Sequence, residues 1–174
     1  MDHPLTFQNL SHEQMDFDDV FAYIYAFMQK HPLGNYKLMM GTDSQVHANY
    51  TRFITGIVIQ REGKGAWACM RKVIVSRKMK GLHERISYET SLTEEVVSLF
   101  TEERKNALIE IVLPYIYKGA TFTIEGHIDI GAGARNRTSA YVNEMMARIE
   151  SLGIDAKIKP DAIVASSYAN KYTK

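Results

Sequence analysis

The chain has little of several residue types, and each shortage excludes a class of protein. It carries one cysteine, Cys69, so an internal disulfide is excluded, and no Cys/His cluster is present to hold zinc. It has only four prolines, and no apolar run approaches the ~18 residues of a membrane span. The stretch MDHPLTFQNL lacks the basic segment and the apolar core of a signal peptide. We therefore expect a cytoplasmic protein with no membrane segment.

A strong excess of one charge is also missing. Lysine and arginine total 21, aspartate and glutamate total 20, and the formal net charge is +1, which argues against a general nucleic-acid coat. The distribution is uneven, because a basic segment at 71–85 is followed by glutamates through Glu110. Such neighbours can place a bound polyanion beside a metal site, or they can be two solvated faces that neutralise each other.

Hydrophobic periodicity predicts a single domain over residues 1–174, with an N-terminal helical extension at 1–33. The extension could cap an exposed sheet edge or form a dimer contact, so a homo-oligomer is a possible state. The predicted elements are a helix at 16–30, strands at 36–43, 52–60 and 66–75, a helical stretch at 87–117 broken at TEERK and Pro114, a strand at 121–130, a helix at 138–152, a strand at 154–158 and a helix at 161–172.

This order predicts an α/β fold with a five-stranded mixed sheet flanked by helices. The first three strands are expected to form an antiparallel meander, joined by a hairpin at REGKG. The long helical stretch is then a crossover, which returns the fourth strand parallel to the first. The fifth strand is expected to be parallel as well.

Two of the predicted strands end in an aspartate. The first leads into Asp43 in GTDSQ, and the fourth leads into Asp129 in HIDIG. Parallel neighbours lie about 4.8 Å apart, so both carboxylates should arrive at the same sheet edge. Two carboxylates so close repel unless a cation lies between them, and Mg²⁺ or Mn²⁺ is the natural cation for an all-oxygen site.

Further carboxylates are expected to complete this site. Glu89 is the first candidate, because it lies in the first turn of the crossover helix; Glu94 and Glu95 are the alternatives. Asp161, which follows Pro160, is a candidate fourth ligand at the start of the last helix. It can equally be an ordinary N-terminal helix residue.

The acids in MMGTDSQ, RISYET, EGHIDIG and KPDA resemble the ribonuclease H-like pattern in type, order and element. The stretches GTDSQVH, ITGIVIQ, EGHIDIGAG and ASSYANKYTK resemble the YkuK family of bacterial ribonuclease H-like proteins over nearly the whole chain. The resemblance implies two-metal hydrolysis of phosphodiester bonds in RNA, an RNA–DNA hybrid or structured DNA. The implied catalytic residues and metal ligands are Asp43, Glu89, Asp129 and Asp161.

Polar and basic residues around the expected site are candidate substrate contacts, although each can also be a plain surface or buried polar residue. Ser44 and Gln45 could bond the phosphate or a sugar hydroxyl, and His127 could orient a carboxylate or relay a proton. The basic candidates for the flanking backbone are Arg135, Arg137 and Lys78, with Lys72 and Lys80 as possible extensions.

Two other functional classes remain open at this point. A non-catalytic nucleic-acid-binding module on the same fold would also explain the acids and the modest charge. An ATP-handling domain is a further alternative, because actin-like kinases also have a strand that ends near an aspartate, a glycine and a threonine. Here Gly41 precedes Thr42-Asp43, and a second phosphate-binding loop is missing from the sequence.

Overall fold

The chain folds into a five-stranded mixed sheet flanked by helices. The computed structural model describes residues 3–131, 133, 138–169 and 172. The elements in chain order are α1 (Phe17–Lys30), β1 (Asn35–Val46), β2 (Thr51–Arg61), β3 (Gly65–Val75), α2 (Leu82–Leu99), α3 (Glu102–Val112), η1 (Leu113–Lys118), β4 (Thr121–His127), η2 (Ser139–Tyr141), α4 (Val142–Glu150), β5 (Asp155–Lys157) and η3 (Val164–Tyr168).

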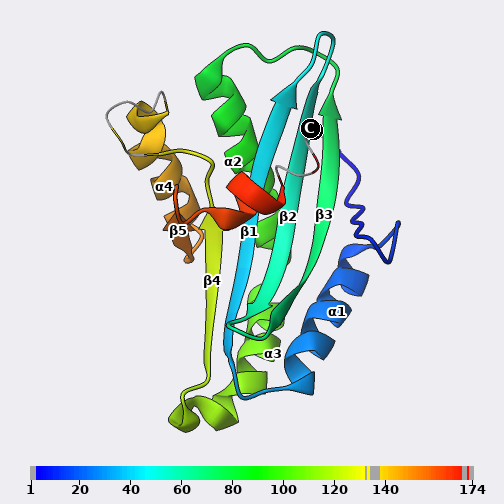
Figure 1. Cartoon of the computed structure of the whole chain (residues 1–174), viewed down its shortest axis with the longest axis vertical. Helices are drawn as coiled ribbons and strands as arrows, with labels where there is room; N and C mark the ends of the chain where they lie inside the picture. Colours follow the sequence, from blue (N-terminus) through cyan, green and yellow to red (C-terminus); the bar gives the residue numbers. More distant parts are fainter. Residues whose placement is uncertain (1–2, 132, 134–137, 170–171, 173–174) are drawn as a thin grey trace.

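The strand order is β3-β2-β1-β4-β5, as Figure 1 shows. β2 runs antiparallel to β1 and β3, whereas β4 is parallel to β1 and β5 is parallel to β4. The predicted fold class, meander and crossover are therefore confirmed. None of the helices in the described part of the chain is long and apolar enough to cross a membrane.

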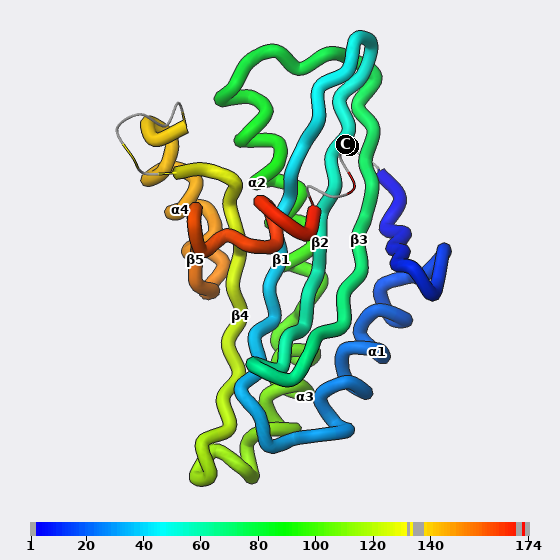
Figure 2. The backbone as a smooth tube through the Cα atoms, viewed as in Figure 1, coloured from blue at the N-terminus to red at the C-terminus, as the bar shows by residue number. Residues whose placement is uncertain are grey.

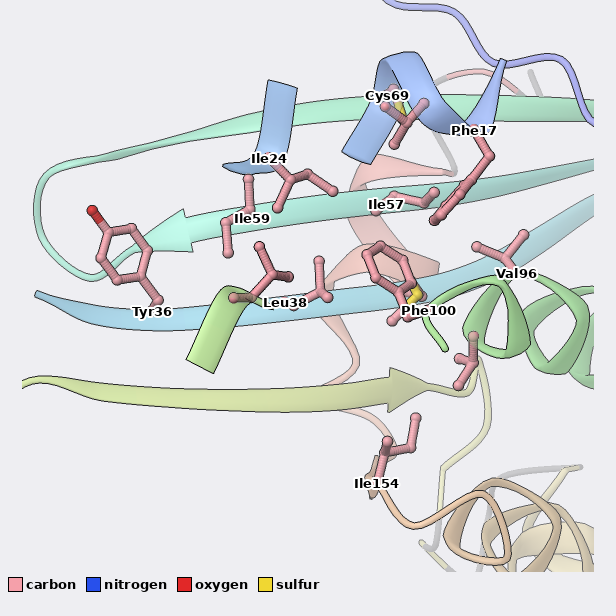
Figure 3. Close-up of a cluster of buried hydrophobic side chains, with 14 of the residues drawn as sticks. Phe17, Ile24, Tyr36, Leu38, Ile57, Ile59, Cys69, Val96, Phe100 and Ile154 are labelled. Carbon is pink, nitrogen blue, oxygen red and sulfur yellow. The ribbon is translucent and has the colours of Figure 1, made fainter. Parts of the chain in front are cut away.

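The two faces of the sheet are covered differently. In Figure 1, α2 and α3 pass behind the sheet, and the C-terminal η3 crosses in front of β1 and β2. The larger core lies on the helical side, where Leu38 and Met40 of β1 meet Ile57 and Ile59 of β2. Figure 3 shows side chains of α1 and α2 closing over this layer, among them Phe17, Ile24 and Val96, together with Phe100 just after α2.

Local signals set the helix starts. The Asp16 carboxylate accepts a hydrogen bond from the Asp19 N–H and the Asp19 carboxylate accepts one from the Asp16 N–H, so a capping box begins α1. Thr101 caps α3 by accepting from the Arg104 N–H. This cap explains the break that TEERK predicted between two helices.

Several boundaries differ from the sequence-based expectation. β4 ends at His127 instead of reaching residue 130, so Asp129 follows the strand, and α2 begins at Leu82, so Glu89 lies in the helix interior and not in its first turn. β1 does not stop at Asp43 but continues to Val46, because its pairing with β2 extends to Val46 and Thr51. The predicted helix at 161–172 is reduced to η3, a π-helical turn, among the residues described there. Asp161 lies in the turn before η3, where its N–H donates to the Ile158 carbonyl at 2.8 Å.

Candidate active site

The register of β1 and β4 brings the segments that carry Asp43 and Asp129 to the same end of the parallel ladder. The last pair of this ladder is Gly41 with His127. Asp43 lies two residues further along β1, whereas Asp129 lies two residues past the end of β4, in a bend where the Ile130 N–H donates to the Ile128 carbonyl. β1 continues beyond this point while β4 has ended, so the edge of β1 opens where the acids lie.

A matched spacing between α2 and β1 places Glu89 at the same edge. The Thr93 hydroxyl lies 2.8 Å from the Thr42 hydroxyl, and the Ser44 hydroxyl donates to the Glu89 carboxylate. From Glu89 to Thr93 the helix rises by about 6 Å, and from Thr42 to Ser44 the strand rises by about 6.6 Å. Because these two rises match, both contacts form together. Thr42 also bonds Thr55 of β2 at 2.8 Å, which fixes the base of this contact.

Burial and the charges of two aspartates act on the carboxyl group of Glu89. Burial raises the pKa of the Glu89 carboxyl well above its ordinary value, and the charges of Asp43 and Asp129 raise it further. The hydrogen bond from Ser44 and the charge of Arg85 act in the opposite direction. Burial dominates, so the Glu89 site favours a neutral carboxyl unless a further cation compensates its charge.

Asp129 has a basic neighbour that the sequence analysis did not identify. The Lys159 ammonium lies 3.1 Å from Asp129 Oδ1, but the angles do not satisfy a hydrogen bond, and this buried oxygen has no hydrogen-bond partner among the described residues. Lys157 pairs with His127 in the β4–β5 ladder, so Lys159 is the register neighbour of Asp129. That register, rather than any motif, was the signal that could have found Lys159.

The acidic side chains of the site are of the kind that bind a cation, but in the described part of the chain they are not arranged as ligands of one ion. Within the described residues, no set of three or more His, Cys, Asp or Glu side chains is arranged to hold a metal ion. Glu89 reaches the edge of β1 from the α2 face, whereas Asp43 shares the η3 face with Gly41. Glu89 is bonded by Ser44, and Asp129 is close to Lys159. The donor set fits Mg²⁺ or Mn²⁺ in chemistry, and Asp129 Oδ1 makes an ion pair with Lys159 but no hydrogen bond to a described residue.

Asp161 is placed elsewhere by the structure. It is exposed and lines a cavity of about 410 Å³ together with Lys37, Glu125 and Lys157. It is not among the charged groups that shift the pKa of Glu89. A role of Asp161 as the fourth acid of the site stays a prediction. The chain makes a turn at Asp161 instead of starting the helix that the sequence predicted.

The predicted substrate contacts have different outcomes. Ser44 is half-buried against Glu89, while Gln45 is exposed on β1 two residues beyond Asp43. Lys78 is exposed in the segment between β3 and α2. Arg135 and Arg137 lie outside the described residues.

His127 is buried inside the protein, in the kind of buried polar position that the sequence analysis gave as the alternative to a substrate contact. Its side chain is 1% exposed, its Nδ1 accepts from the Val164 N–H at 3.1 Å, and its Nε2 lies 3.0 Å from Glu125 Oε1. Since Nδ1 accepts, the ring proton is on Nε2 and is donated to Glu125. His127 thus joins β4 to η3. Burial lowers the pKa of its imidazole, and the neighbouring Glu125 opposes that shift.

The basic segment at 71–85 is not one continuous surface. Arg71 is fully buried, where it donates to the Pro4 carbonyl at 3.0 Å and pairs with Glu95 at 3.2 Å. Arg77 forms an ion pair with Glu84 at 2.9 Å. The lysines between and beside them are exposed, so they retain the charge that a polyanion would meet.

Comparisons with known proteins define the class to which this fold and this group of acids correspond. The chain belongs to the ribonuclease H-like family, whose family model, described as "Ribonuclease H-like", matches residues 19–174. It is similar to the uncharacterized protein YkuK of Bacillus subtilis (strain 168), with 44% identity over 168 residues that cover 97% of this chain and 96% of the relative. No solved structure matches the chain. The resemblance predicted from the sequence motifs is confirmed.

Proposed function

We propose that this chain is a nuclease that depends on Mg²⁺ or Mn²⁺ and hydrolyses phosphodiester bonds in RNA, an RNA–DNA hybrid or structured DNA by a two-metal mechanism. The observation that carries the proposal is the convergence of three carboxylates from β1, α2 and the end of β4. The charges of Asp43 and Asp129 act on a buried Glu89. Without a bound cation, this repulsion and the burial of a carboxyl group destabilise the folded protein.

Asp43, Glu89 and Asp129 are the residues that would hold the ions. When bound, the ions neutralise charge on the phosphate and make a water molecule more acidic. The Ser44 hydroxyl keeps Glu89 at the edge of β1, and the Thr42–Thr93 contact keeps α2 in register behind it. Lys159 offsets the charge of Asp129, and its ammonium is available to a phosphate oxygen once Asp129 ligates a cation.

Cleavage assays with separate substrates test the proposal. The protein is incubated with RNA, an RNA–DNA hybrid and branched DNA, with Mg²⁺, with Mn²⁺ and with a chelator. We expect metal-dependent cleavage, reduced at least about 100-fold in Asp43→Asn and in Asp129→Asn. Asp155→Asn, at an exposed acid on β5, is the matched control and should cleave like the wild type. Cleavage that survives both site substitutions would refute the assigned residues.

A variant of Asp161 separates the sequence hypothesis from the structural one. The placement of Asp161 beside Lys37 and Glu125 leads us to expect that Asp161→Asn keeps the wild-type rate within about threefold. A loss as large as that of Asp129→Asn would return Asp161 to the site as its fourth acid. The comparison requires the same substrate and the same metal concentration for both variants.

The second candidate is a non-catalytic nucleic-acid-binding module. It is favoured by the finding that, in the described part of the chain, the acids are not grouped as ligands of one ion. This function predicts salt-dependent binding of nucleic acid, no cleavage, and no heat when Mg²⁺ is titrated into the protein. In both candidates the partner is a nucleic acid, and we place the protein in the cytoplasm.

A further inference from the structure

The hairpin between β1 and β2 extends the face that carries Asp43. In the antiparallel ladder, Asp43 is opposite Ile54 and Gln45 is opposite Arg52. His47 and Tyr50 continue the same register, with the His47 N–H donating to the Tyr50 carbonyl at 2.8 Å. Residues two apart on a strand share a face, so this hairpin tip lies on the aspartate side of the sheet. Four residues of strand separate His47 from Asp43 by about 13 Å.

The tip of this hairpin carries a stacked pair of rings. The centroids of His47 and Tyr50 are 4.4 Å apart and their planes differ by 17°. Both residues are half-buried, so part of the pair remains open to solvent. A base of a nucleic acid can stack on the exposed part of such a pair, in the same way as the two rings stack on each other.

The charge around the hairpin suits a polyanion. Residues 44–54, at the hairpin end of β1 and β2, include Arg52 and contain no aspartate or glutamate. Arg52, Lys72 and Lys78 form none of the ion pairs found between described residues, whereas Arg71 and Arg77 each have a carboxylate partner. Lys72 is exposed on β3 opposite Ile54, which continues the row of Asp43 across the sheet. These cations therefore keep their charge for a partner.

The hairpin is also held in place before any partner binds. The Thr51 hydroxyl donates to the Arg77 carbonyl at 3.0 Å and accepts from the Met79 N–H at 2.9 Å. Met79 packs with Phe53 in a small buried cluster. These contacts tie the base of the hairpin to the segment that carries Lys78, so the rings and the cations form one preorganised surface.

We propose that His47, Tyr50 and Arg52 form a platform that binds a single-stranded segment of the nucleic acid beside the bond to be cleaved. The assignment rests on the proposed function for its substrate class. Tyr50 and His47 stack on a base, and Arg52 contacts the backbone phosphate. A single strand is the fitting occupant because its bases expose their faces, whereas bases inside a duplex are already stacked.

Binding without divalent metal tests the platform independently of cleavage. Fluorescence anisotropy is measured in chelator with labelled oligo(dT), oligo(rU) and a blunt DNA duplex, each longer than a site of about 16 nucleotides. We expect Tyr50→Ala to weaken binding of the single strands about 5- to 100-fold. Duplex binding should change less than about twofold, because the base faces there are covered. Arg52→Gln should reduce the slope of log K against log salt by about 0.7.

The opposite end of the molecule supplies matched controls. Tyr117 of η1 is 80% exposed, and Lys64 is exposed in the turn between β2 and β3. Figure 2 shows both segments at the end of the sheet away from the β1–β2 hairpin. Tyr117→Ala and Lys64→Gln should bind every probe like the wild type. Tyr50→Leu keeps apolar bulk at the tip, so it replaces Tyr50→Ala if thermal melting shows that the alanine variant does not fold.

The outcomes separate this proposal from the nuclease proposal. Equal affinity of wild type and Tyr50 variants for both single strands overturns the platform, and so does a wild type that binds none of the probes. If the wild type binds through Tyr50 but cleaves nothing, the platform stands and the nuclease proposal fails. If the wild type cleaves, and the Tyr50 variants change neither affinity nor KM, the nuclease proposal stands and the platform fails.

Discussion

At the residue scale, burial decides the protonation of the two titratable side chains that border the site. Glu89 is buried near two other acids, and the pKa of its carboxyl is raised. His127 is buried with both ring nitrogens bonded, and the pKa of its imidazole is lowered. In each case the neutral form is favoured, because the loss of hydration destabilises the charged form more than its neighbours stabilise it.

We predict that Glu89→Gln stabilises the metal-free protein in a pH-dependent way. A raised carboxyl pKa contributes stability that is complete below the unfolded value of about 4.3 and is lost as the pH rises through the folded value. Glutamine cannot ionise, so the variant should gain about 1–3 kcal/mol at about pH 8 and little at about pH 4. Urea unfolding in chelator at both pH values measures the gain. Glu110→Gln, at an exposed position, is the control. A gain of equal size at both pH values would show that ionisation of Glu89 is not its cause.

We predict that His127→Ala removes about 2–4 kcal/mol of stability, because it leaves a cavity and unpairs the Val164 N–H and the Glu125 carboxylate. The wild type should also lose stability as the pH falls below the unfolded histidine value of about 6.5, since its folded pKa is lower. Denaturation curves between about pH 5 and pH 8 measure both effects. The alanine variant should lack this part of the pH dependence. If it retains the full slope, another group is responsible.

At the element scale, two glycines let η3 lie against the sheet. A Cβ at Gly41 would come within 2.9 Å of the Ala165 backbone nitrogen and 3.0 Å of the His127 carbonyl oxygen. A Cβ at Gly56, opposite Gly41 on β2, would come within 2.6 Å of the Tyr168 ring. The bare backbone of this pair is therefore what allows η3 to cross β1 and β2, and Figure 1 shows this crossing.

We predict that Gly41→Ala costs about 1–3 kcal/mol and displaces η3, because the atoms that would be contacted belong to backbone and cannot turn away. Thermal unfolding measures the loss, and proteolysis after Tyr168 reports the displacement. Gly133→Ala is the control, since a Cβ there would meet nothing within 4 Å. An unchanged melting temperature in Gly41→Ala would show that η3 is not held by this contact.

The elements and the neighbouring acids could be predicted, but the segment after β5 could not. Apolar periodicity and the helix crossover were enough to predict the antiparallel meander of the first three strands and a fourth strand parallel to the first. The position of Asp161 depends instead on contacts of Lys159 and Val164 with distant residues, which no local pattern displays. β1 was predicted too short for a similar reason: its polar end is stabilised by pairing with β2, which outweighs the turn preference of Asp43.

At the scale of the whole molecule, the acids come from three different elements of the fold. Asp43 shares with Gly41 the face of β1 that η3 covers, and Glu89 reaches the edge of β1 from α2 on the other face. Asp129 follows the end of β4, which joins only β1 and the short β5. A cation bound between these carboxylates would therefore connect α2, β1 and the end of β4, and its binding energy would add to the stability of the entire fold.

We therefore predict that Mg²⁺ or Mn²⁺ raises the melting temperature of the whole chain. A ligand at about 100 times its Kd contributes about 2.7 kcal/mol, which for a chain of this size corresponds to a rise of about 5–10 °C. Calorimetry with increasing metal should show one transition that moves upward, because the ion links elements that unfold together. Asp129→Asn should abolish the shift, whereas Asp155→Asn, at an exposed acid on β5, should retain it. A shift that persists in Asp129→Asn would place the cation elsewhere. If the melting temperature of the wild type does not change with metal, a metal-dependent reaction at these residues loses its basis.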